Sequence, residues 1–165
     1  MTPTVEQLVA VVAEEAEHCE RLLGLMKRQQ EHLVSGDTGA IEINVREQEM
    51  ALRRSHDLER RRQRLVDAIA QEQGMGGEKP DLARIIATVS NDYGRRLTEL
   101  RTSMKKSIER LSKTKEQNRM LIEQSLGNIN EFIRLIAAAN GPSPEYTPGH
   151  RVAATSMPLS VNRVG

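Results

Sequence analysis

Aromatic residues are almost absent from this sequence of 165 residues. It has no Trp, a single Phe (Phe132) and two Tyr (Tyr93 and Tyr146). Sheets and ligand pockets usually recruit aromatic and β-branched side chains. The composition therefore favours helices that pack through Leu, Ile, Val, Met and Ala.

Three further absences narrow the class of protein. Cys19 is the single cysteine, which excludes an intramolecular disulfide and argues against a disulfide-built secreted domain. No apolar run approaches the ~18 residues of a membrane span, and the first residues lack the pattern of a signal peptide. Lys and Arg number 24 against 23 Asp and Glu, so no net field attracts nucleic acid or an anionic membrane. We therefore expect a cytoplasmic protein with no nucleic-acid partner and no membrane insertion.

Apolar residues recur every seven positions over the first part of the chain. The row consists of Val5, Val12, Cys19, Met26 and Leu33. It predicts a long helix over about residues 4–34, beginning at the capping-box residues Thr4 and Gln7. Ser35-Gly36-Asp37 then predicts a tight turn into an antiparallel helix that ends near Gln73. The apolar set of this second helix is Ile41, Val45, Leu52, Leu58, Leu65, Val66 and Ile69.

The second half of the chain predicts a break, a short helix and a last, very long helix. Gly74–Pro80 is the break, the short helix covers about residues 81–89, and the last helix ends near Ala139. The sequence thus predicts an all-α fold, an elongated antiparallel helical bundle or coiled coil of three long helices plus one short helix. This bundle covers residues 1–140, and residues 141–165, which contain prolines, are expected to form a disordered, flexible tail.

Motifs for catalysis or metal binding are weak. Glu15 and His18 form an isolated E-x-x-H match, which di-iron bundles use only in pairs with two further Glu residues. No P-loop, H-E-x-x-H or G-x-S-x-G motif occurs. Cys19 lies in an apolar row and is interpreted as a small buried hydrophobe. We expect no catalytic residue, no metal and no cofactor, and hence no enzyme.

Arginines cluster in the second helix, at Arg53-Arg54 and across Arg60–Arg64. Six Arg against Asp57 and Glu59 give a local charge of +4, whereas the first helix is about three charges negative. Nucleic-acid binding would use such a patch, with aromatics for stacking on single strands. Because those aromatics are missing, the arginines are better explained as complementary to the first helix or as a solvated face.

The stretch "KEQNRMLIEQSLGNINEFIRLI", residues 115–136, combines a wide apolar arc with polar interruptions. Lys115, Asn118 and Ser125 fall where a core would be apolar, and each would destabilise the fold if it were buried without a partner. They could instead fix helix register, as a polar core position does in coiled coils. A third interpretation is a groove left partly uncovered for an amphipathic partner helix.

Three segments in order resemble a known family. They are "EHLVSGDTGAIEINVREQEMALRRSHDLERRRQRLV" (31–66), "KEQNRMLIEQSLGNINEFIRLI" (115–136) and "PEYTPGHRVAATS" (144–156). Their order and spacing are similar to those of the FlgN-like flagellar export chaperone family, over about residues 7–155. The resemblance implies a binding protein that holds hook-associated (hook–filament junction) proteins before export and delivers them to the flagellar type III export apparatus.

The family is thought to recognise the C-terminal helical segments of its substrates through the C-terminal part of the chaperone. Carried onto this sequence, the resemblance implies that the substrate-binding residues are Asn118, Leu121, Ile122, Ser125, Leu126, Ile129, Phe132 and Ile133. The alternative function is that of a structural coiled-coil protein that self-associates. Under this alternative the chain forms a homo-oligomer. A further hypothesis is that the tail occupies the groove, because Tyr146, Met157, Leu159 and Val161 are its sparse apolar residues.

Overall fold

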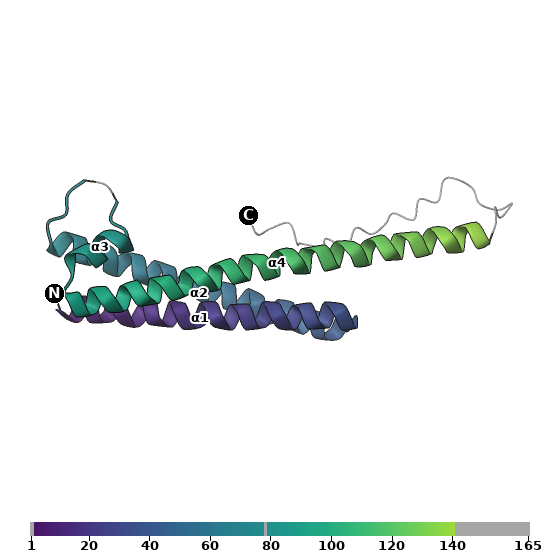
Figure 1. Cartoon of the computed structure of the whole chain (residues 1–165), viewed down its shortest axis with the longest axis horizontal. Coiled ribbons are helices and arrows are strands. Elements are labelled where there is room, and N and C mark those ends of the chain that lie inside the picture. The colour runs from purple at the N-terminus through teal and green to yellow at the C-terminus, as the bar shows by residue number, and fades with distance from the viewer. Residues whose placement is uncertain (1, 78, 141–165) are drawn as a thin grey trace. The chain divides into compact units, whose positions relative to one another are not determined.

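Two long helices joined by a tight turn form the first half of the protein. The computed structural model describes residues 2–77 and 79–140, so the predicted tail lies outside the described residues. Helix α1 spans Thr2–Ser35 and α2 spans Thr38–Glu72 (Figure 1). Gly36 has a φ of 70°, in the left-handed region that glycine favours, and Asp37 Oδ1 accepts a hydrogen bond from the Ala40 N–H at 3.0 Å. The predicted turn is confirmed.

The second half contains the short helix and the longest helix. Helix α3 spans Leu82–Thr88, with Asp81 as its N-cap, and α4 spans Asn91–Ala139. The predicted all-α class, with three long helices and one short helix, is confirmed, and the described residues contain no strand. One boundary prediction was wrong, because α1 begins before Thr4, and Pro3 is tolerated in a first helical turn. The Thr4 hydroxyl donates instead to Glu72 at 3.3 Å.

All four helices contribute to one apolar core near the beginning of α1. The fully buried side chains there are Leu8 and Val12 of α1, Val66 and Ile69 of α2, Ile85 of α3 and Leu97 of α4. The chain divides into two units, residues 1–124 and 125–165, and this core belongs to the first. The described part of the second unit is the end of α4, residues 125–139, together with Asn140.

The first half of α2 packs differently from the prediction. Val45 and Leu52 are exposed, and the buried residues are Asn44, Ala51 and Leu58, which recur every seven positions. Asn44 Nδ2 donates to the Leu25 carbonyl oxygen of α1 at 2.9 Å, which satisfies its buried amide. The α1–α2 interface therefore uses a small residue and a hydrogen-bonded amide where the sequence pattern indicates Val and Leu.

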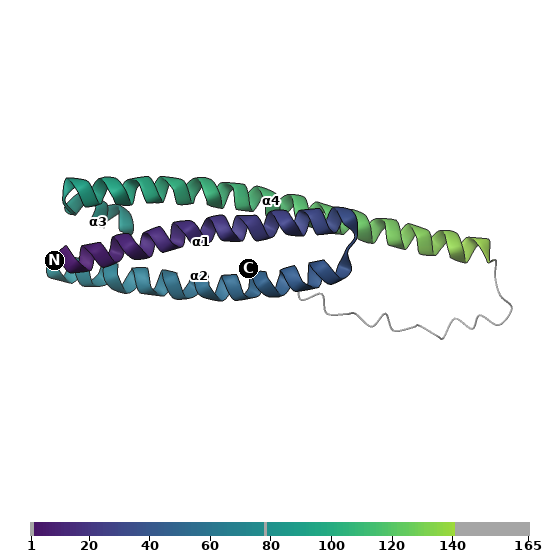
Figure 2. The same cartoon turned by 90° about the horizontal axis from the view of Figure 1, so that it is seen from below.

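Helices α1 and α4 run parallel with a constant register. Glu6 bonds to Tyr93, Glu20 to Ser107 and Gln30 to Gln117, and each pair is 87 positions apart in the sequence. Figure 2 shows α1 between α2 and the first part of α4. Helix α1 thus contacts α2 in the antiparallel sense and α4 in the parallel sense.

Candidate protein-binding face

The contact between α1 and α4 becomes polar after Met104. The buried α4 residues there are Ser107, Thr114 and Asn118. The Ser107 hydroxyl donates to the carboxylate of Glu20, and the Thr114 hydroxyl donates to the carbonyl oxygen of Arg110 in its own helix. Small or amphipathic side chains bury less apolar surface than Leu or Ile, so this part of the contact gains less from the hydrophobic effect.

Asn118 lies buried against α1, with 2% of its surface exposed. Its Nδ2 donates to the Met26 carbonyl oxygen at 2.9 Å and to Gln29 Oε1 at 3.1 Å. Lys115 and Ser125, the other polar interruptions in the stretch 115–136, are exposed. Only Asn118 of the three is therefore a buried polar position, and its contacts are those expected of a residue that fixes helix register.

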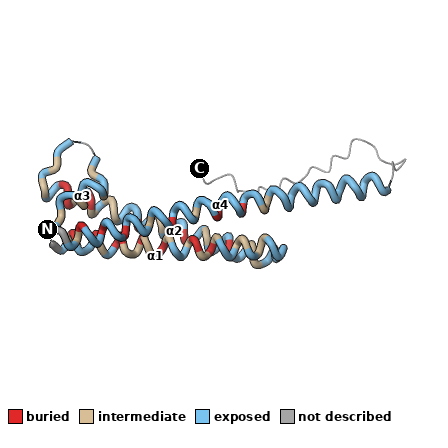
Figure 3. Tube along the Cα trace, viewed as in Figure 1, coloured by how far each residue is buried: buried red, intermediate tan, exposed pale blue. Residues whose placement is uncertain are grey.

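The contact ends where α1 ends. With a register offset of 87, Ser35 at the end of α1 corresponds to Ile122 of α4. Leu121 and Ile122 are half-buried, and every residue from 123 to 140 is exposed. Figure 3 shows this change from buried and intermediate to exposed positions along α4.

Large apolar side chains nevertheless continue along the exposed end of α4. We call this exposed apolar surface the terminal apolar face. It consists of Leu126, Ile129, Phe132, Ile133, Leu135 and Ile136. Their exposed fractions lie between 45% and 63%. A cluster of large exposed apolar side chains on one stretch of helix marks a candidate protein interaction site.

The structure separates the predicted substrate-binding residues into three groups. Asn118 is buried against α1, Leu121 and Ile122 are half-buried, and the remaining residues are exposed, namely Ser125, Leu126, Ile129, Phe132 and Ile133. Leu135 and Ile136 were outside the predicted set, although they follow Phe132 and Ile133 by three positions, the spacing of one helical face.

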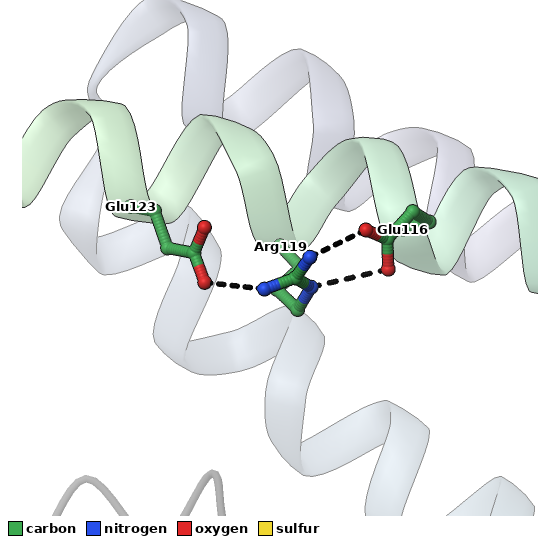
Figure 4. A network of polar contacts seen from close by, with 3 residues as sticks. All are labelled: Glu116, Arg119 and Glu123. Carbon is green, nitrogen blue, oxygen red and sulfur yellow. Dashed lines mark hydrogen bonds and ion pairs between the residues drawn. The ribbon is translucent and has the colours of Figure 1, made fainter.

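A charged network lies on α4 where its contact with α1 ends. Arg119 donates to both carboxylate oxygens of Glu116, at 3.1 and 2.5 Å, and to Glu123 at 2.5 Å (Figure 4). The hydrogen bond from Arg119 lowers the pKa of Glu116, and hydrogen bonding to Glu116 raises the pKa of Arg119. Pairs at i, i+3 and i, i+4 stabilise a helix, so this network supports a continuous α4 at this point.

The E-x-x-H residues connect α1 to α2. His18 Nε2 lies 2.7 Å from the Ala51 carbonyl oxygen, and Glu15 pairs with Arg62 at 3.0 Å. No group of three potential metal ligands occurs within the described part of the chain. Likewise, none of the helices described here is long and apolar enough to cross a membrane.

Two residues of the arginine cluster bind glutamates of α1. Arg62 pairs with Glu15, and Arg54 forms an ion pair with Glu14. Arg60 pairs with Asp57 within α2. For Arg54 and Arg62 the interpretation of the cluster as complementary to the first helix is therefore confirmed. Cys19, interpreted as buried, is half-buried, and burial raises the pKa of its thiol.

Comparison with known proteins gives one finding. A family model described as FlgN protein matches residues 1–152. The search found no significant match among curated proteins or among solved structures.

Proposed function

The chain belongs to the FlgN family, and we propose that it is a cytoplasmic flagellar type III export chaperone. Its substrates are the hook-associated proteins of the hook–filament junction. It binds their C-terminal helical segments, prevents them from aggregating too early and delivers them to components of the export apparatus.

The terminal apolar face is the observation that carries this proposal. Five of its side chains, all but Leu135, recur at the spacing of one helical face, which is the pattern that an amphipathic partner helix covers. The stretch holds a single acidic and a single basic residue, Glu131 and Arg134, between residues 125 and 140. A partner would therefore be recognised chiefly through apolar burial, with polar residues at the margins.

The expected affinity is moderate. Burying ~600 Å² of apolar surface would contribute on the order of 15 kcal/mol gross. Loss of translational and rotational freedom and the ordering of side chains oppose binding by about 4–15 kcal/mol or more. The balance allows reversible binding, which a chaperone that releases its cargo requires.

Calorimetric titration with the C-terminal segment of a hook-associated protein from the same organism tests the proposal. We expect saturable binding at micromolar concentration or below, with the negative heat-capacity change that apolar burial produces. Absence of binding by a protein shown to be folded and helical would overturn the proposal.

Substitutions on the terminal apolar face locate the site. Ile129→Asp and Phe132→Asp are each expected to abolish binding, because each places a charge in the surface that the partner must cover. Met50→Asp is the matched control, since Met50 is a comparably exposed apolar residue, on α2. Equal loss of binding in all three variants would show that the terminal apolar face has no special role.

A self-associating structural protein is the second candidate. Leu126, Ile129, Ile133 and Ile136 are separated by three, four and three positions, a spacing that also suits pairing with a helix of a second copy. Light scattering across a dilution series distinguishes the two functions. A stable dimer or larger oligomer without affinity for the hook-associated segment would favour the structural one.

A further inference from the structure

The sequence continues for 25 residues beyond Asn140, the last described residue of the segment that carries the terminal apolar face. Those 25 residues contain one short segment in which apolar and other residues alternate, Met157-Pro158-Leu159-Ser160-Val161. Helix α4 thus exposes an apolar surface, and a short apolar segment follows 18 positions after its last residue, Ala139.

We propose that the segment Met157–Val161 docks on the terminal apolar face of the unloaded chain and competes there with the incoming partner. The docking itself is independent of what that partner is, and its role as a competitor of a hook-associated segment rests on the proposed function.

The spacing of apolar side chains along the segment Met157–Val161 matches their spacing along α4. Pro158 lacks an N–H and disfavours helical backbone at Met157, so the segment favours an extended conformation. In extended backbone, Met157, Leu159 and Val161 point to one side, about 6.6 Å apart. On α4, Ile129 and Ile133 are separated by a rise of about 6 Å, as are Phe132 and Ile136. Successive apolar side chains of the segment therefore meet successive turns of the helix.

The intervening chain is long enough for this return. Residues 141–156 span up to about 50 Å when extended, whereas α4 rises only about 15 Å from Leu126 to Ile136. The segment can therefore reach any part of the terminal apolar face, in either direction along the helix.

The covalent connection to α4 favours this segment, rather than a second copy of the chain, as the occupant of the terminal apolar face. A segment joined covalently to its site through 16 intervening residues has an effective concentration on the order of millimolar. A second copy at micromolar concentration competes poorly with it unless its affinity is about a thousandfold higher. With an intrinsic dissociation constant of about 0.1 mM, the segment would weaken partner binding roughly tenfold.

Paramagnetic relaxation tests the docking without any partner protein. The full chain carries Cys19→Ser, to remove the native thiol, and Ser160→Cys with a nitroxide spin label. We expect the methyl signals of Ile129 and Ile133 to broaden while that of Ile43, an exposed isoleucine on α2, stays sharp. No broadening at Ile129 and Ile133 would overturn the proposal.

Two variants and a mixing experiment complete the test. Replacing Met157, Leu159 and Val161 together by Ser should abolish the broadening, whereas replacing Val152, Ala153 and Ala154 together by Ser should leave it unchanged. Loss in both variants, or in neither, would contradict docking through the alternating segment. Broadening that appears between spin-labelled chains and separate isotope-labelled chains would assign the face to a second copy and overturn the proposal.

Partner binding separates this proposal from the proposed function. The variant with serines at 157, 159 and 161 should bind the hook-associated segment with about tenfold lower Kd than the variant with serines at 152–154. Equal Kd values would overturn the proposal that Met157–Val161 competes with the partner. If neither variant binds the hook-associated segment, but the broadening persists in the chain that keeps Met157, Leu159 and Val161, the docking stands and the proposed function fails.

Discussion

Asn118 of α4 donates a hydrogen bond to the main-chain carbonyl oxygen of Met26 on α1, across 2.9 Å. The amide is buried, and within the described residues its Oδ1 accepts no hydrogen bond. A buried amide that leaves an acceptor unmatched contributes little net stability but restricts the register in which two helices pair. This contact accounts for one of the polar residues that interrupt the apolar pattern of α4.

Asn118→Leu is therefore expected to raise the free energy of unfolding by about 1 kcal/mol, because it replaces a partly satisfied amide by apolar burial. The same variant should loosen the register of α1 against α4. Urea unfolding measures the first effect. The yield of a disulfide between Gln30→Cys and Gln117→Cys, in a Cys19→Ser background, measures the second. A less stable variant with an unchanged disulfide yield would show that the amide stabilises the interface directly.

Burial raises the pKa of the Glu15 carboxyl above its ordinary value of 4.5, and Arg62 opposes this shift only in part. The folded state then holds the proton more tightly than the unfolded chain. The stabilising contribution of this titration is present below the unfolded pKa and is lost as the pH rises through the folded pKa. Glu15→Gln removes the titration, so its stability relative to the original protein should increase from about pH 4 to pH 7.

Urea midpoints across this pH range check the prediction, and two arginine variants serve as controls. Arg62→Gln should steepen the loss of stability with pH, because it removes the cation that favours ionised Glu15. Arg61→Gln should leave the pH dependence unchanged, since Arg61 is exposed on the same helix. Parallel stability curves for Glu15→Gln and the original protein would contradict the assignment.

Two glycines should respond in opposite ways to alanine. Gly24 lies inside α1, where an added Cβ meets no atom within 4 Å, so Gly24→Ala should stabilise the protein by about 0.5–1 kcal/mol. Gly36 has a φ of 70°, so Gly36→Ala should destabilise it by about 1–2 kcal/mol. Thermal unfolding of both variants measures the difference. Changes of the same sign would show that the conformation of the turn is adaptable.

Stability should also distinguish the core from the terminal apolar face. Leu97→Ala removes a fully buried side chain and is expected to lower the free energy of unfolding by about 2–5 kcal/mol. Phe132→Ala, at an exposed position, should lower it by much less than Leu97→Ala does. A large loss with Phe132→Ala would mean that this face is already covered by strong contacts in the unloaded protein.

The sequence predicted the helices well because their ends carry local chemistry. Asp37 and Asp81 cap helices through their own side chains, and Gly36 adopts the backbone conformation that ends α1. Interfaces depend on distant partners and were predicted less well. Val45 and Leu52 fit an apolar pattern but are exposed, whereas Ala51 is buried and its carbonyl oxygen lies 2.7 Å from the His18 ring.

In the candidate site, too, local features were predicted from the sequence, whereas features that depend on a distant helix were not. Spacing along a single helix indicated the wide apolar arc from Leu121 to Ile136, because periodicity is local information. It could not distinguish Asn118, which is buried, from Ser125, which is exposed. That difference depends on where α1 ends, and the end of α1 has no signature in the sequence of α4.

The constant offset between α1 and α4 has a consequence for how the chain acquires its structure. Helices α1 and α2 meet across a short turn, whereas α1 meets α4 only across 87 positions. Contacts between near neighbours in sequence form faster than those that close long loops. During synthesis the first hairpin can pair while α4 is still being made, and α4 then docks last.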